Sequence, residues 1–153
     1  MDVLIIEDDV LHRAYLNEAV RAALPECGTV LEAENGRAGE KLARENRTAH
    51  IVMDLQMNER NGIEAARTIW KERPDTRILF WSNYSDEAYV RGVSRIVPEG
   101  AAYGYVLKSA SDDRLRLALR SIIYRGAMRD RPRSPRPAGK EPRKGAWVLR
   151  HGI

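Results

Sequence analysis

The stretch Val3-Leu4-Ile5-Ile6-Glu7-Asp8-Asp9 places four apolar residues directly before three carboxylates. Consecutive apolar residues, most of them β-branched, are typical of a strand that is buried on both faces of a parallel sheet. A second stretch, His50-Ile51-Val52-Met53-Asp54, has the same pattern and also ends in an acid. The two stretches therefore predict buried parallel strands whose ends carry carboxylates.

Around these two stretches, residues 1–124 alternate between short apolar runs and amphipathic segments. Five strands alternating with five helices favour an α/β fold, in which a doubly wound five-stranded parallel sheet carries helices on both faces. Asn35-Gly36 is a turn signal. The strands are predicted at residues 3–6, 29–33, 50–53, 77–81 and 104–107. The helices are predicted at residues 10–24, 38–46, 63–73 and 86–96, and from the capping Ser111 onward.

The composition changes after about residue 124. Residues 125–153 hold nine Lys and Arg against two acids, whereas residues 1–124 hold 17 against 20. The net charge of +4 therefore belongs to a mildly acidic body with a basic end. This end is rich in proline and has little to bury. We expect one domain at residues 1–124 and a basic, Pro-rich, disordered tail at residues 125–153.

The composition also bears on the cellular setting. The single cysteine, Cys27, cannot form an internal disulfide, which fits a reducing compartment. No run approaches the roughly 20 apolar residues of a membrane span. The start, Met1-Asp2, is acidic and is unlike a secretory signal. We expect a cytoplasmic protein that does not enter the membrane.

Several strands are followed by side chains suited to chemistry. Carboxylates follow the first and third strands, Ser82 follows the fourth and Lys108 the fifth. In a doubly wound sheet these ends meet, and the ligand site lies there. Converging carboxylates repel one another unless a cation is bound, and Mg²⁺ suits two or three carboxylates with waters. A carboxylate can attack phosphorus to give an acyl phosphate while a metal and a lysine neutralise the charge. The pattern thus indicates phosphoryl transfer.

Four blocks occur in order and at suitable separations: residues 5–9, 51–57, 80–82 and 100–108. Together they resemble the receiver domain of two-component response regulators over residues 1 to about 124. The resemblance is to receivers of LuxR/NarL-type regulators, whose DNA-binding output domain has no counterpart in these residues. It implies the flavodoxin-like receiver fold.

The resemblance implies a role for each functional residue. Asp54 would accept a phosphoryl group from a histidine kinase or a phosphotransfer protein. Ser82 would sense that group, and Lys108 would form an ion pair with it. Tyr105 would be the aromatic side chain whose orientation reports the switch. The implied Mg²⁺ ligands are Glu7, Asp8, Asp54 and the backbone carbonyl of Gln56.

The chain departs from the family at two places near the site. Asn58 stands where the family often has proline, which leaves the geometry of that loop less defined. Asn83 follows Ser82 where a small residue is usual, and it could narrow access to Asp54 for small phosphodonors. The scattered histidines share no metal-ligand spacing, and Trp70 and Trp81 fit packing better than base stacking.

The leading hypothesis is a phosphorylation-switched signalling module and not a turnover enzyme. Phosphorylation would change its partner-binding or dimerisation surface. The resemblance implies a homodimer formed through the fourth helix, fifth strand and fifth helix. The charged residues of the fifth helix that would permit it are Asp112, Asp113, Arg114, Arg116 and Arg120.

Two other functions remain open. A truncated DNA-binding transcriptional regulator would act through another protein, because the tail lacks the two helices of a helix-turn-helix and would attach to DNA only weakly and without sequence specificity. A phosphohydrolase would use Asp54 as nucleophile. Such enzymes favour a second aspartate as general acid two residues later, where this chain has Gln56, which cannot supply a proton.

Overall fold

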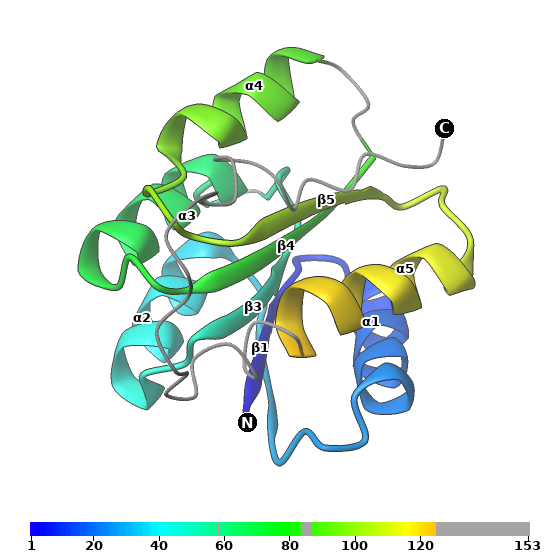
Figure 1. Ribbon diagram of the computed structural model, residues 1–153. Helices are drawn as coiled ribbons and strands as arrows, with labels where there is room; N and C mark the ends of the chain where they lie inside the picture. The colour runs from blue at the N-terminus through cyan, green and yellow to red at the C-terminus, as the bar shows by residue number, and fades with distance from the viewer. Residues whose placement is uncertain (58, 84–86, 125–153) are drawn as a thin grey trace, which may run out of the picture.

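The computed structural model describes residues 1–57, 59–83 and 87–124. These residues form a five-stranded parallel sheet in the order β2-β1-β3-β4-β5, with helices on both faces (Figure 1). The predicted doubly wound α/β fold is therefore confirmed. The strands are β1 Val3–Ile6, β2 Val30–Ala33, β3 His50–Met53, β4 Arg77–Ser82 and β5 Tyr103–Leu107. The helices are α1 Val10–Ala23, α2 Gly36–Asn46, α3 Gly62–Glu72, α4 Glu87–Ile96 and α5 Asp112–Ala118, followed by the π-helix η1 Leu119–Tyr124.

The predicted tail at residues 125–153 and the departure at Asn58 lie outside the described residues. The element bounds differ from the predicted ones by one or two residues at several ends. Among the described residues, no helix combines the length and the apolar character that a membrane span needs.

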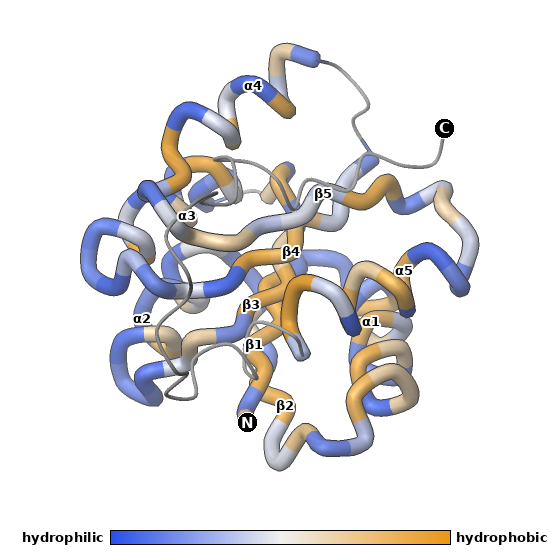
Figure 2. The backbone as a smooth tube through the Cα atoms, in the orientation of Figure 1, coloured by the Kyte–Doolittle hydropathy of each residue, from blue (hydrophilic) through white to orange (hydrophobic). Residues whose placement is uncertain are grey.

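The two faces of the sheet are covered by different helices. Because successive strand residues point to opposite faces, Leu4 and Ile6 pack with α2, α3 and α4, whereas Val3 and Ile5 pack with α1, α5 and η1. All four of these side chains are fully buried. Figure 2 shows the apolar strands running through the middle of the molecule. This double burial explains why the strands are apolar runs and do not alternate with polar residues.

The helices that follow the strands begin at capping side chains. Asp9 accepts a hydrogen bond from His12 N, and Ser111 accepts one from Arg114 N. Asn35 caps α2 in the same way, so the predicted turn at Asn35-Gly36 is instead the N-cap and first residue of a helix. A Cβ at Gly36 would lie 2.4 Å from the Arg60 carbonyl oxygen. The glycine is therefore explained by a close backbone approach and not by a turn.

The end of the fifth helix was not predicted. The apolar residues Leu115 and Ala118 of this helix are buried, but its last part, Leu119–Tyr124, is π-helical. Leu119, Ile122 and Ile123 are fully buried there against the sheet. The spacing of apolar residues alone does not distinguish a π-helical turn from an α-helical one.

The loop after β3 depends on a glycine, which gives a first test. A Cβ at Gly62 would lie 2.3 Å from the Asp54 carbonyl oxygen and 2.7 Å from Leu55 Cα. Backbone atoms must move to admit it, so we expect Gly62→Ala to lower the free energy of unfolding by about 3 kcal/mol in urea denaturation. Gly92→Ala is the control, because its nearest neighbour is the flexible end of Ile63 at 3.2 Å. Equal stability of the two variants would contradict this account.

Candidate functional site

The carboxyl ends of three strands on one edge of the sheet, β1, β3 and β5, bring the site together, with β4 between β3 and β5. Glu7, Asp54 and Lys108 each follow the last residue of a strand, β1, β3 and β5 respectively. Backbone hydrogen bonds continue the sheet by one residue at each of these positions. Asp54 N donates to Ile6 O at 3.0 Å, and Lys108 N donates to Ser82 O at 2.7 Å. The strand ladder therefore fixes where each functional side chain starts.

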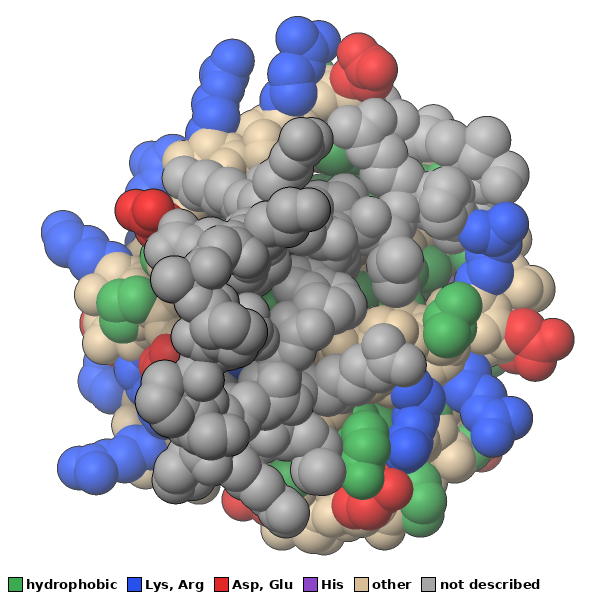
Figure 3. Space-filling view, in the orientation of Figure 1, with side chains coloured by type: hydrophobic (Ala, Val, Ile, Leu, Met, Phe, Trp, Pro, Cys, Tyr) green, Lys and Arg blue, Asp and Glu red, His purple; other side chains and the backbone are tan. Residues whose placement is uncertain are grey.

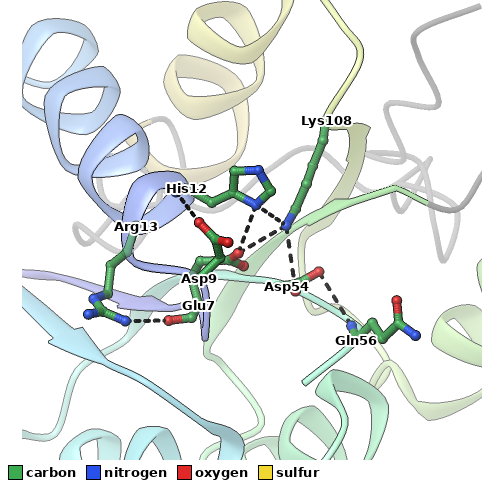
Figure 4. A network of polar contacts seen from close by, with 7 residues as sticks. All are labelled: Glu7, Asp9, His12, Arg13, Asp54, Gln56 and Lys108. Carbon is green, nitrogen blue, oxygen red and sulfur yellow. Dashed lines mark hydrogen bonds and ion pairs between the residues drawn. The ribbon is translucent and has the colours of Figure 1, made fainter. Parts of the chain in front are cut away.

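A buried ammonium lies between two buried carboxylates (Figure 4). Lys108 Nζ donates to Glu7 Oε1 at 3.0 Å and lies 3.6 Å from Asp54 Oδ2. Glu7 is fully buried, Asp54 is 4% exposed, and the Lys108 side chain is 8% exposed. Two carboxylates thus face one ammonium in a site largely removed from water. Such a site carries one negative charge in excess when all three groups are ionised.

Burial, together with this excess charge, perturbs the pKa values of the two carboxyl groups. Burial raises the pKa of Glu7, although the hydrogen bond and charge of Lys108 oppose the rise. Burial, followed by the charge of Glu7, raises the pKa of Asp54 to about 7, with Lys108 again opposing. Desolvation and like charge both penalise the ionised form. The site therefore favours any ligand that adds positive charge.

The acidic residues fit a divalent cation. Glu7, Asp8 and Asp54 each offer a carboxylate oxygen, and these oxygens lie within 4.8 Å of one another. Glu7 Oε2 is buried and has no hydrogen-bond partner within the described part of the chain. A buried carboxylate oxygen without a partner is costly unless a cation or water reaches it. Carboxylate oxygens are the ligands that Mg²⁺ prefers.

The other predicted site residues are Gln56, Ser82 and Tyr105. Gln56 N donates to Asp54 Oδ1 at 3.3 Å, which places the Gln56 backbone beside the carboxylate. Ser82 ends β4 and is fully buried next to the end of β5. Tyr105 lies in β5 and is buried in the core, with its ring 6.5 Å from that of Phe80. The role of Tyr105 as a switch stays a prediction.

Two side chains at the site were assigned no role from the sequence. His12 Nδ1 lies 3.2 Å from Glu7 Oε1 and 3.0 Å from Lys108 Nζ. Trp81 presents its ring to Lys108 Nζ, 4.8 Å from the ring centroid. For His12 a signal was available, since α1 begins directly after the acidic residues and its first turn must lie beside them. For Trp81 the sequence offered only a buried strand position.

Known proteins share both the sequence pattern and the fold. The family described as response regulator receiver domain matches residues 3–120. Transcriptional regulatory protein DegU of Brevibacillus brevis is 32% identical over 127 residues, which cover 83% of this chain and 52% of DegU. Oxygen regulatory protein NreC of Staphylococcus haemolyticus is 37% identical over 95 residues, covering 61% of this chain and 41% of NreC. The chain spans about half the length of the curated relatives it matches.

Solved structures show the same arrangement of strands and helices. Chemotaxis protein CheY4 of Vibrio cholerae superposes with a TM-score of 0.68 at 19% identity, covering 80% of this chain and 98% of CheY4. A response regulator receiver domain of Clostridium thermocellum gives a TM-score of 0.67 at 21% identity, covering 83% of this chain and 97% of that domain. At these identities the likeness concerns the fold.

The fold and its acidic pocket define a signalling domain of the receiver class. More specifically, the chain belongs to the response regulator receiver domain family of two-component systems. Phosphorylation and Mg²⁺ binding are typical of this family.

The raised pKa of Asp54 gives a second test. In the folded protein this carboxyl group holds its proton up to about pH 7, whereas the unfolded chain releases it near pH 4. Without divalent cations, its contribution to the free energy of unfolding should therefore fall as pH rises between these values. We expect Asp54→Asn to stabilise the metal-free protein by about 2 kcal/mol at pH 8 and by little at pH 4.5.

Urea denaturation in chelator at both pH values measures this difference. Asp75→Asn is the control, because the side chain of Asp75 is exposed on the surface. If Asp54→Asn raised the free energy of unfolding equally at both pH values, the destabilisation could not be assigned to ionisation of the buried Asp54 carboxyl group.

Proposed function

We propose that this chain is a phosphorylation-switched module in which Asp54 accepts a phosphoryl group from a histidine kinase or a phosphotransfer protein. The observation that carries the proposal is the buried Asp54 carboxylate, with the Lys108 ammonium 3.6 Å away and two further carboxylates beside it. Mg²⁺ would be held by Glu7, Asp8 and Asp54 together with the backbone carbonyl of Gln56. Bound there, it would neutralise charge on the carboxylates and on the phosphoryl oxygens.

The chemistry follows from the position of the side chains. An Asp54 oxygen attacks the phosphorus of a phosphohistidine, the new O–P bond forms as the P–N bond breaks, and the electron pair stays on the imidazole nitrogen. Lys108 is close enough to Asp54 to pair with the transferred group. The Ser82 hydroxyl, at the adjacent strand end, would donate to one of its oxygens. The added charge of about −1.5 to −2 would then draw both side chains toward Asp54.

The same site argues for a switch and against a turnover enzyme. Hydrolysis of an acyl phosphate or an ester is helped by an acid or base two residues after the nucleophile, and Gln56 there can neither donate nor accept a proton as a catalyst. We therefore propose that the chain catalyses only its own phosphorylation and dephosphorylation. The single cysteine, Cys27, supports a reducing location such as the cytoplasm.

The start of α1 offers a docking surface for the phosphodonor protein. Val10 and Leu11 follow the acidic residues directly and are 68% and 78% exposed. Two neighbouring apolar side chains with that exposure favour contact with another protein. A partner that covers them would bring its phosphohistidine next to Asp54.

A dimer through α4, β5 and α5 remains a proposal. Asp112, Asp113 and Arg116 line a cavity of about 340 Å³ shared with α1, and Arg120 pairs with Glu26 at 3.2 Å. These charges therefore lie on the α1 side. Exposed apolar side chains give better support for the dimer, because Tyr89 on α4 is 38% exposed and Leu117 on α5 is 61% exposed.

A role in transcription is supported by the relatives, which include transcriptional regulatory proteins, and it would be exerted through other residues or another protein. In the described part of the chain, the five α-helices all pack on the sheet as a receiver fold requires. On the face shown in Figure 3, Lys and Arg side chains stand at separate places around the rim. Where this face is visible, the distribution does not favour a DNA-binding surface there.

Phosphate incorporation tests the proposed function directly. With Mg²⁺ and a phosphodonor, the wild type should shift on a phosphate-affinity gel, whereas Asp54→Asn or added chelator should reduce the shift to background. Asp75→Asn should behave as the wild type, because it removes an exposed charge just before β4, at the opposite edge of the sheet from the carboxyl ends that form the site. Both a phosphorylated histidine kinase and acetyl phosphate should be tried, because the exposed Asn83, next to Ser82, could narrow the access of a small phosphodonor to Asp54. Undiminished incorporation in Asp54→Asn would refute the assignment.

Light scattering tests the dimer. We expect the mass of the wild type at high concentration to rise toward that of a dimer when beryllofluoride mimics the phosphoryl group. Leu117→Glu should weaken this association about tenfold or more, because it places a charge in an apolar contact. Leu11→Glu is the control on α1 and should leave the association intact. A mass that is the same with and without the mimic would exclude dimerisation as the output.

A further inference from the structure

Lys108 has an uncharged partner that the phosphoryl-transfer chemistry described above does not use. Its ammonium lies over the ring of Trp81, 4.8 Å from the ring centroid. Trp81 is 4% exposed, and the Lys108 side chain is 8% exposed. An ammonium over the face of a tryptophan ring is attracted by the ring quadrupole, and the attraction is strongest where water is excluded.

The Trp81 ring is itself held on two sides. Tyr15 stacks on it with ring centroids 5.7 Å apart and an interplanar angle of 13°. His12 meets it edge-on at 5.6 Å. The Tyr15 hydroxyl donates a hydrogen bond to the Asp112 carboxylate at the start of α5. This hydrogen bond, together with burial, raises the pKa of Tyr15 to about 12.

The ring matters most when a divalent cation is bound. In the described structure the shortest ion pair of Lys108 is with Glu7 Oε1, at 3.0 Å. Glu7 is also a proposed ligand of the cation, and a carboxylate shared with Mg²⁺ attracts an ammonium less. The cation also repels the ammonium directly. Lys108 must nevertheless stay beside Asp54 if it is to meet the phosphoryl group.

Trp81 meets this need without competing for either charge. Its ring attracts the ammonium but offers no oxygen or nitrogen lone pair to Mg²⁺. It also forms no ion pair that would have to break when the phosphoryl group arrives. The other neighbour, His12 Nδ1, can either accept from Lys108 or donate to Glu7, and it cannot do both at once.

We propose that Trp81 is a positioning residue for phosphoryl transfer. Its ring face, fixed by Tyr15, holds the Lys108 ammonium beside Asp54 while Glu7 is committed to the divalent cation. This inference rests on the proposed function of the site.

Four variants separate positioning from structural damage. Trp81→Leu keeps an apolar side chain but removes the ring, and Trp81→Phe restores a ring face. Trp70→Leu is the matched control, because Trp70 is equally buried but packs against Phe80 and Tyr103. Tyr15→Leu removes the ring that stacks on Trp81. Because the Tyr15 side chain is itself 38% exposed, this variant is expected to fold.

The first readout is the rate of Asp54 phosphorylation at saturating Mg²⁺ and phosphodonor, corrected for the folded fraction. We expect Trp81→Leu to slow it about tenfold, Trp81→Phe to recover most of the loss and Tyr15→Leu to slow it about threefold. Trp70→Leu should leave the corrected rate unchanged. If Trp81 had a purely structural role, Trp70→Leu and Trp81→Leu would lower the corrected phosphorylation rate equally.

The second readout does not require phosphorylation. The ε-methylene protons of Lys108 should show an upfield ring-current shift in NMR spectra of the wild type, both with and without Mg²⁺, and this shift should vanish in Trp81→Leu. Loss of the shift on adding Mg²⁺ to the wild type would overturn the inference. So would equal phosphorylation rates for the wild type and Trp81→Leu. If the wild type takes up no phosphate from any donor, the proposed function fails, and the positioning role fails with it.

Discussion

The ion pair between Lys108 Nζ and Glu7 Oε1, 3.0 Å long and buried, is the interaction around which the site is organised. It joins the end of β1 to the end of β5 across a sequence separation of 101 residues. A single ammonium cannot balance both Glu7 and Asp54 in a site with little water. Burial, followed by the charge of Glu7, raises the pKa of Asp54, and Glu7 Oε2 has no hydrogen-bond partner within the described part of the chain. A divalent cation would relieve both effects.

The sheet gives this charged site a connection to each of its two faces. Phe80 and Tyr105 pack on the side of α2, α3 and α4, whereas Trp81 packs on the side of α1 and α5. Lys108 follows β5 directly and touches Trp81, so a change in the position of its ammonium reaches the α1 side. Ser82 ends β4 and lies next to β5. One phosphoryl group could therefore bias contacts on both sides of the sheet, since packed interfaces shift between discrete arrangements.

Membership in the receiver family explains why the site needs only a few kinds of functional group. A module that stores one phosphoryl group needs a nucleophile, charge neutralisation and a surface that responds, and it gains nothing from fast turnover. In the proposed function, Asp54 and its charged neighbours would provide the first two. The exposed apolar side chains at the start of α1 and on α5 would then be the surfaces that respond.

The sequence by itself determined the strands, the helices on both faces of the sheet and the acidic pocket. Apolar, β-branched runs indicate strands buried on both faces, and the carboxylates that follow them must lie at the strand ends. It also named Glu7, Asp54 and Lys108 correctly as neighbours, since strand ends in such a sheet must meet. Only the tertiary structure decided what surrounds Lys108. The contacts with His12 and Trp81 depend on how α1 packs over the end of β4, and no local propensity encodes that. The π-helical end at Leu119–Tyr124 was missed for the same reason, since packing against distant residues selects among helical conformations that the local sequence permits. The N-cap at Asn35 is a local hydrogen bond, and it was missed because Asn-Gly is also a turn signal.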